Sequence, residues 1–328
     1  MRGTVKGLAV IHPGMQSLIQ DSGRFGFHTI GLTTGGPLDY SAFRWANRLC
    51  GNSDAAACIE VLMGGLILEA QVATQIAVTG AVIPLTINHR PVDCWRSHCL
   101  RPGDRVELGN ATAGCRTYVA VTQGIGSQSS FGSVATVMRE SLGGLKGDGE
   151  PLKAGDILPC SPSESDTCLA LHKSYQPRHM KNECSLRVVL GYQQARFSQS
   201  QKQLFFSSDY QLSTDCDRMG FRLAGPAIQI SPVNTTKRAT TSLLSEGICL
   251  GAIQFPGDGQ PIILMRDRQT IGGYPKIGSV LSIDLDGLAQ LLPGGTVHFE
   301  AIGIERAHNL LHLNERRFQN APLVAVTD

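Results

Sequence analysis

Several patterns that mark common protein classes are missing from this sequence. No Cys-x-x-Cys pair occurs among its 10 cysteines. Cys94, His98 and Cys99 are too closely spaced, and lack a second pair of ligands, for a zinc site. We therefore predict no metal and no disulfide, and we expect the cysteines to be buried thiols.

Long apolar runs and clusters of like charge are also absent. No segment approaches the ~18 apolar residues of a membrane-spanning helix, and no apolar stretch follows the basic residues near the N-terminus. Only 17% of the residues are charged, the net charge is +2, and lysine and arginine are spread along the chain. This pattern predicts a cytoplasmic protein that binds neither nucleic acid nor a membrane surface.

Two well-known catalytic sequence patterns are not found either. The chain has no Gly-x-x-x-x-Gly-Lys-[Ser/Thr] phosphate loop and no Gly-x-Ser-x-Gly nucleophile turn. Gly124 and Gly126 lack the third glycine of a dinucleotide-binding fingerprint. We therefore expect no ATPase activity from this chain alone.

Glycine and proline, in contrast, are abundant. The chain has 37 Gly and 16 Pro in 328 residues, and 42% of its residues are hydrophobic. Frequent turns favour strands over long helices, and the length favours two domains. Regular periodicity fails between Pro159 and Cys184, so we expect a linker over about residues 160–183, an N-terminal β-rich domain over 1–177 and a C-terminal β-barrel over 178–328.

Short apolar runs bounded by glycine or polar residues predict the strands. The expected strands cover residues 7–11, 17–20, 59–63, 65–68, 75–82, 85–88, 105–108, 116–122, 186–190 and 261–265. Helical spacing predicts helices over residues 39–49, 198–206 and 305–318, with Asp39 and Ser198 as N-terminal caps.

A polar loop, residues 267–278, directly follows the apolar strand at 261–265. Gly272, Gly273 and Pro275 shape its backbone and would hold Tyr274 and Lys276 in fixed positions. The concentration of hydrogen-bonding side chains is typical of a binding loop. The alternative is a polar hairpin turn whose charges are simply solvated.

A second glycine-rich loop begins at Asp21 in the first half of the chain. Glycines at 23, 26, 31, 35 and 36 predict irregular backbone, with Asp21 and Arg24 as the charges available to a ligand. The alternative is an ion pair between Asp21 and Arg24 that merely holds the loop.

Ordered motifs along nearly the whole chain resemble one family. They are Gln20-Asp21-x-Gly23-Arg24-x-Gly26, Ala46-Asn47-Arg48-Leu49-x-Gly51-Asn52, Asp217-Arg218-Met219-Gly220, Gly251-x-Ile253-Gln254-x-Pro256-x-Asp258-Gly259 and Asp267-Arg268-Gln269-Thr270-x-Gly272-Gly273-Tyr274-Pro275-Lys276. This set resembles the family of the 5-oxoprolinase C subunit, also called the allophanate hydrolase subunit 2 or KipA family, whose fold is biotin-dependent carboxyltransferase-like.

The resemblance implies a mainly β fold with two cyclophilin-like β-barrel domains and a few short helices. It also implies an enzyme subunit that works with the KipI-like B subunit and the A subunit of 5-oxoprolinase, using ATP through the complex to convert the cyclic amide 5-oxoproline to glutamate. One alternative is a carboxyltransferase component of a biotin-dependent urea carboxylase and allophanate system. Another is a non-catalytic, KipA-like regulator that binds a kinase inhibitor protein.

Opening a lactam or transferring a carboxyl group places negative charge on oxygen, which fixed donors stabilise. From the motifs we predict catalytic roles for Arg268, Lys276, Asp267 and Arg218. We predict substrate binding by Gln254, Gln269, Tyr274, Asp21 and Arg24.

Overall fold

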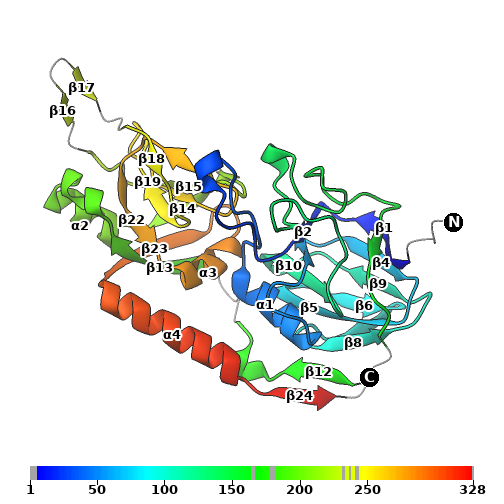
Figure 1. Ribbon diagram of the computed structural model, residues 1–328. Coiled ribbons are helices and arrows are strands. Elements are labelled where there is room, and N and C mark those ends of the chain that lie inside the picture. The colour runs from blue at the N-terminus through cyan, green and yellow to red at the C-terminus, as the bar shows by residue number, and fades with distance from the viewer. Residues whose placement is uncertain are drawn as a thin grey trace. The chain divides into compact units, whose positions relative to one another are not determined.

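The computed structural model describes residues 6–163, 167–177, 182–230, 233–235, 238–240 and 244–326. The chain forms two compact units (Figure 1). Unit 1 comprises residues 1–25, 34–180 and 320–328, and unit 2 comprises residues 26–33 and 181–319. The predicted domain boundary at residue 178 lies outside the described residues and stays a prediction.

Unit 1 is built from two antiparallel sheets. The first has the order β11 (Ile157–Pro159), β1 (Gly7–Pro13), β4 (Leu66–Ala70), β9 (Arg105–Leu108), β6 (Leu85–Ile87) and β7 (Arg90–Val92). The second has the order β2 (Gln16–Gln20), β3 (Cys58–Leu62), β10 (Ala113–Val121), β5 (Thr74–Val82) and β8 (Ser97–Leu100). β12 (Cys168–Leu171) pairs with β24 (Leu323–Val326).

One apolar core lies between the two sheets of unit 1. It includes Leu68 and Val106 from the first sheet and Ile59, Val78 and Val119 from the second, all fully buried or nearly so. Alternate residues of each strand supply this core, as expected of sheets that share one buried face.

Helix α1 (Tyr40–Leu49) packs against β5 and β10 of the second sheet. The Asp39 carboxylate caps it by accepting a hydrogen bond from the Ala42 backbone nitrogen at 2.8 Å. Buried Glu60 holds the entry to the helix, since its carboxylate accepts from the Leu38 nitrogen at 2.9 Å and from the Tyr118 hydroxyl at 2.6 Å. The predicted helix over 39–49 is confirmed.

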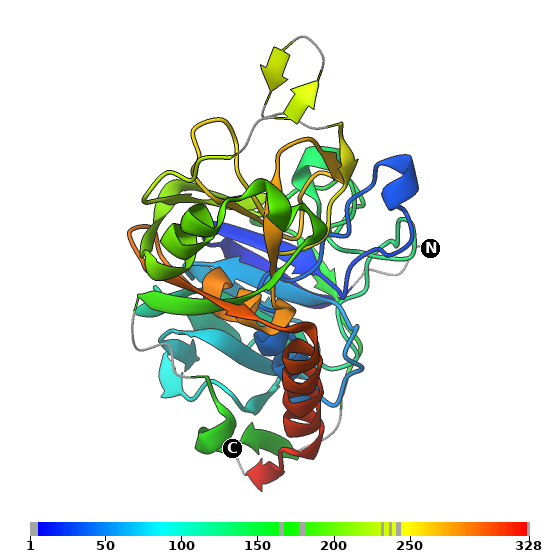
Figure 2. The same ribbon diagram turned by 90° about the vertical axis from the view of Figure 1, so that its left-hand side faces the viewer.

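Unit 2 contains a closed barrel. Its strands follow the order β13 (Glu183–Leu190), β22 (Lys276–Val280), β19 (Ala252–Gln254), β20 (Ile262–Leu264), β15 (Gly220–Ala224), β14 (Tyr210–Cys216) and β23 (Thr296–Ile302). The parallel pairing of β13 with β23 closes the ring. Two small antiparallel pairs accompany it, β16 (Val233–Thr235) with β17 (Arg238–Thr240) and β18 (Glu246–Gly247) with β21 (Ile271–Gly272). The β16–β17 hairpin projects from the barrel (Figure 2).

Helices α2 (Gln199–Ser207), α3 (Leu285–Ala289) and α4 (Ile304–Asn320) also belong to the second half of the chain. Ser198 caps α2, as predicted, by accepting from the Gln201 nitrogen at 3.2 Å. Phe205 of α2 stacks on Phe299 of β23, with 4.4 Å between ring centroids. Short 3-10 turns complete the fold: η1 (His28–Ile30), η2 (Met138–Glu140), η3 (Lys173–Tyr175), η4 (Tyr192–Arg196) and η5 (Ser282–Asp284).

The predicted mainly β class with a few short helices is confirmed, and helices α2 and α4 fall where the sequence placed them. The closed barrel expected of both halves is found in unit 2, whereas the strands of unit 1 form two separate hydrogen-bonded sheets. The expected linker contains strand β12, because the apolar residues Cys168 and Leu171 are buried there.

The ten cysteines are all free thiols. Burial raises the pKa of the Cys94 thiol to about 11, which keeps it protonated at neutral pH. Across the residues that the structure describes, no helix is both long and apolar enough to cross a membrane.

Candidate substrate pocket of unit 2

Three neighbouring strands of the barrel contribute one side chain each to a row in which an apolar residue lies between two polar residues. Gln254 of β19 lies opposite Ile262 of β20, and Ile262 lies opposite Arg222 of β15. Residues opposite one another in a sheet point to the same face, so these three side chains form a cross-strand row. Their chain neighbours Phe221, Ile253 and Ile263 point to the other face and are buried.

A pocket of about 490 Å³ lies over this row. Its lining residues come from the β14–β15 turn, from β19 and β20, and from the loop after β20. They are Thr214, Asp215, Cys216, Asp217, Met219, Gly220, Arg222, Gln254, Ile262, Leu264, Gln269 and Tyr274. The three predicted substrate-binding residues of the second half, Gln254, Gln269 and Tyr274, therefore meet in one pocket.

The amide of Gln254 is the most informative group of this pocket. The residue is only 1% exposed, and its side-chain nitrogen has no hydrogen-bond partner among the described residues. A buried donor without an acceptor costs about 1–3 kcal/mol, so such groups are uncommon in proteins unless they serve a function. Because Gln254 also lines the pocket, its amide is the candidate donor to a bound ligand.

Gly272 allows the chain to pass close to this amide. A Cβ atom at residue 272 would lie 2.9 Å from the Gln254 side-chain nitrogen and 3.5 Å from that of Gln269. The glycine that the sequence singled out for its backbone freedom is therefore needed for close approach to the two amides.

The pocket also contains charged groups. The Arg222 side chain is exposed and forms no hydrogen bond or ion pair with any described residue, and the same is true of the Asp215 carboxylate. Asp217 instead accepts from the backbone nitrogens of Met219 at 2.8 Å and Gly220 at 3.1 Å, which shapes the turn. Sequence reasoning missed Arg222 and Asp215 as site residues, because the alternation of Arg222 with buried Phe221 and Leu223 is shared by ordinary surface charges.

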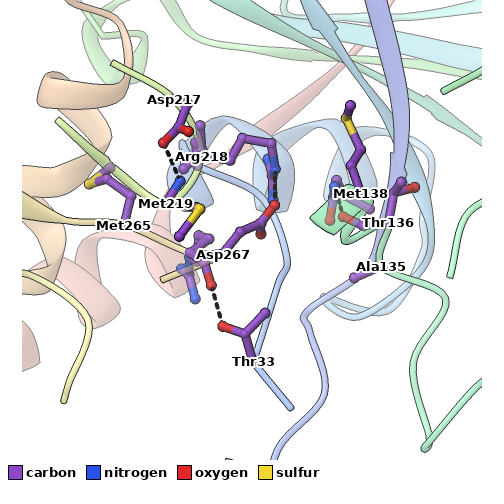
Figure 3. Close-up of polar contacts among 12 residues, drawn as sticks. Thr33, Ala135, Thr136, Met138, Asp217, Arg218, Met219, Met265 and Asp267 are labelled. Atoms are coloured by element: carbon purple, nitrogen blue, oxygen red, sulfur yellow. Dashed lines mark hydrogen bonds and ion pairs between the residues drawn. The ribbon is translucent and has the colours of Figure 1, made fainter. Parts of the chain in front are cut away.

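Arg218 and Asp267 form a buried, two-pronged ion pair (Figure 3). The Arg218 Nε and Nη2 atoms donate to the two Asp267 oxygens at 2.8 and 3.0 Å. The Asp267 backbone nitrogen also donates to the Arg218 carbonyl at 2.8 Å. The pair thus ties the β14–β15 turn to the loop after β20, and neither residue lines the pocket; its predicted catalytic role stays a prediction.

Arg268 is a buried cation that is not among the residues lining the pocket. Burial lowers the pKa of its guanidinium to about 10. Its Nε donates to the Ile248 carbonyl at 3.3 Å, and it forms no ion pair with any described residue. Thr33 donates to the Arg268 carbonyl at 2.8 Å, which attaches residues 26–33 to unit 2 (Figure 3).

Lys276 belongs to a polar cluster beside the cross-strand row, opposite Gln254 in the pairing of β22 with β19. Its ammonium group pairs with Glu246, and its backbone nitrogen donates to the Gln193 side-chain oxygen at 2.8 Å. Burial acts to raise the pKa of Glu246, but hydrogen bonds from Lys276, Tyr192 and Gln193 lower it overall. Lys276 is not among the residues that line the pocket.

The two predicted binding residues of the first half hold their own loop in unit 1. The Asp21 carboxylate accepts from the Gly23 nitrogen at 2.9 Å, the Ser133 hydroxyl at 2.6 Å and the Val134 nitrogen at 2.8 Å. Arg24 is buried, and its Nη2 donates to the Ala135 carbonyl at 2.9 Å. These contacts of Asp21 hold the loop through Gly23, Ser133 and Val134, and both the ion pair with Arg24 and substrate binding by either residue stay predictions.

We expect Lys276→Ala to lower the free energy of unfolding by about 1.5–3 kcal/mol, because Glu246 loses a charged partner. Thermal denaturation measures this loss. The matched control is Lys153→Ala, whose exposed ion pair with Glu150 contributes at most about 1 kcal/mol. A fall in turnover of about 10²–10³ beyond the loss of folded protein would support the predicted catalytic role; unchanged turnover would remove Lys276 from the site.

The described residues contain no group of three or more His, Cys, Asp or Glu side chains placed to hold a metal ion. The polar groups that line the pocket are two amides, a phenol, a hydroxyl, a thiol, two carboxylates and one guanidinium. These groups can bind a small polar molecule that carries a carbonyl group and a charge.

Comparison with known proteins shows which protein family this chain belongs to. The family model described as carboxyltransferase domain, subdomain A and B, matches residues 30–301, and the chain belongs to this family. Among its relatives is the 5-oxoprolinase C subunit of Escherichia coli (strain K12), 34% identical over 313 residues that cover 95% of this chain and 96% of that protein. The same subunit of Haemophilus influenzae is 32% identical, covering 92% and 93%. The predicted family is confirmed.

A solved structure shows the same fold in a larger protein. The crystal structure of Kluyveromyces lactis urea carboxylase matches with a TM-score of 0.86 and 26% identity over 98% of this chain. The matched part is 30% of that protein, so this chain corresponds to one segment of a multidomain enzyme.

Proposed function

We propose that this chain is the C subunit of an ATP-dependent 5-oxoprolinase, acting in the cytoplasm with the A and B subunits to convert 5-oxoproline to glutamate. End-to-end similarity to the 5-oxoprolinase C subunit supports this proposal. The observation that carries it is the unpartnered Gln254 amide nitrogen in a pocket sized for a small molecule. A lactam carbonyl is an acceptor that matches this donor.

The proposed role of the pocket follows from the charge that develops on the substrate. Ring opening adds water to the lactam carbonyl carbon, breaks the C–N bond and leaves a proton on the released nitrogen. Negative charge grows on the carbonyl oxygen before the bond breaks. A donor already fixed in place stabilises that charge without reorganisation, so Gln254 is suited to this role, with Gln269 and Tyr274 orienting the ring.

The pocket does not fit ATP itself. Asp215 and Asp217 line it together with the single cation Arg222, and two carboxylates oppose the phosphates of a nucleotide. We therefore assign no ATP-dependent step to these residues. ATP belongs to the complex as a whole, and energy-dependent activation of the lactam requires the partner subunits.

A second candidate function is the carboxyltransferase component of a biotin-dependent urea carboxylase. The match to the K. lactis enzyme favours it. The ureido ring of biotin presents a carbonyl beside N–H groups, as a lactam does, so Gln254 would suit it as well. The non-catalytic regulator predicted from the KipA resemblance differs from both, because it needs no substrate in the pocket.

Co-expression with candidate A and B subunits tests the main proposal. We expect the three chains to co-purify and to release glutamate from 5-oxoproline only when ATP is present. This chain alone should hydrolyse neither ATP nor 5-oxoproline, because it has no phosphate-binding loop. Separate elution from the B subunit in size-exclusion chromatography at micromolar concentration would contradict the proposed assembly.

A further inference from the structure

We infer that Arg222 binds the carboxylate of the substrate and makes the pocket selective for an anionic lactam over neutral amides, including urea. The inference rests on the proposed function and extends it to substrate specificity. Arg222 lies outside the set of residues that the sequence motifs pointed to as functional, and its role comes from its place in the barrel.

The cross-strand row sets the distance between the two binding groups. Gln254 and Arg222 lie two strands apart, with Ile262 between them. Adjacent strands are about 4.8 Å apart, so the two backbones are separated by about 10 Å, and both side chains lie on the same face. A small ring fits between an amide donor and a guanidinium at this spacing.

The floor between these groups is apolar. Ile262 and Leu264 of β20 line the pocket and belong to a buried cluster with Ile248 and Ala252. The methylene carbons of a five-membered lactam suit such a floor. In 5-oxoproline the carbonyl and the carboxylate are borne by the two ring carbons that flank the nitrogen. They point away from one another, so the carbonyl can face Gln254 while the carboxylate faces Arg222.

Charge supports the same assignment. The Arg222 guanidinium has no hydrogen bond or ion pair with any described residue, and a planar guanidinium pairs with a carboxylate through two parallel hydrogen bonds. The Asp215 carboxylate, also without a partner among the described residues, is an acceptor available to the ring N–H. Because Asp215 and Asp217 share the pocket, a ligand with several negative charges is disfavoured.

Urea leaves this arrangement incomplete. It is neutral and has no carboxylate, so Arg222 would gain no ionic partner when urea binds. A site that pairs with a charged substrate group discriminates strongly against an analogue that lacks it. The row therefore favours 5-oxoproline as the substrate of this pocket.

The test uses the complete complex with the A and B subunits and two substrates, 5-oxoproline and 5-oxoprolinamide. The second has the same ring with a neutral carboxamide in place of the carboxylate. We expect the unsubstituted complex to prefer the acid. Arg222→Gln should lower kcat/KM for the acid about 10- to 100-fold, mainly through KM, and leave the amide nearly unaffected, so that the preference disappears.

Two further variants complete the design. Arg222→Lys keeps the charge but not the paired geometry, and it should recover part of the preference for the acid. Arg306→Gln removes an exposed arginine paired with Glu300, outside the pocket, and it should change neither substrate. An acid-to-amide preference that is the same in Arg222→Gln as in the unsubstituted complex would overturn the inference and leave the proposed function standing. A complex that uses neither substrate would overturn the proposed function and the inference with it.

Discussion

Gln254→Leu is expected to lower turnover of the 5-oxoprolinase complex by about 10²–10³ while leaving the protein at least as stable as before. The activity loss is the size seen when one preorganised oxyanion donor is removed. Stability should hold or rise by about 1 kcal/mol, because the substitution removes a buried amide nitrogen without a partner in the described part of the chain. Loss of turnover without loss of stability is expected when a side chain serves ligand binding and not folding.

Glutamate release and thermal denaturation, measured side by side, check this prediction. The matched control is Gln75→Leu in unit 1, where the buried amide nitrogen donates to the Thr167 carbonyl at 3.1 Å. That variant should lose about 1–3 kcal/mol of stability with unchanged turnover per folded molecule. If Gln254→Leu behaves like the control, the Gln254 amide is structural and the pocket loses its central donor.

Asp267→Ala is expected to destabilise unit 2 by about 3–5 kcal/mol. The substitution leaves the Arg218 guanidinium buried without the carboxylate that accepts from its Nε and Nη2 atoms. It also loosens the connection between the β14–β15 turn and the loop after β20, which both contribute residues to the pocket lining. Chemical denaturation of the purified chain measures the loss.

A double variant separates the structural role of this pair from its predicted catalytic role. Replacing both partners with apolar residues, as in Arg218→Met with Asp267→Leu, should restore most of the stability because no unpaired charge remains. Restored stability with full turnover would make the pair purely structural. Restored stability with turnover still reduced would support the catalytic roles predicted for Arg218 and Asp267. A single Asp267→Ala variant as stable as the parent would contradict the burial of the pair.

Local patterns were sufficient to predict much of the fold. Asp39 and Ser198 were identified as helix caps from spacing alone, and both caps form. The apolar strand before residue 267 and the glycines of the following loop led to Gln269 and Tyr274, which line the pocket. These features depend on neighbours in the chain, so the sequence displays them directly.

Long-range pairing could not be predicted in the same way. Lys276 was assigned to the site, yet its ammonium group pairs with Glu246, 30 residues away and in the short strand that pairs with β21. Arg222 alternates with the apolar residues of its strand, which in sequence is indistinguishable from a solvated surface charge. Only the register of β15, β20 and β19 places Arg222 in line with Gln254.

The most direct test of the proposed function compares 5-oxoproline with urea as the molecule that stimulates ATP hydrolysis by this chain in complex with the A and B subunits. We predict stimulation by 5-oxoproline with one glutamate released per ATP consumed, no stimulation by urea, and loss of the response when this chain is omitted. Stimulation by urea and bicarbonate in the presence of a biotin carrier, with no response to 5-oxoproline, would contradict the proposed function.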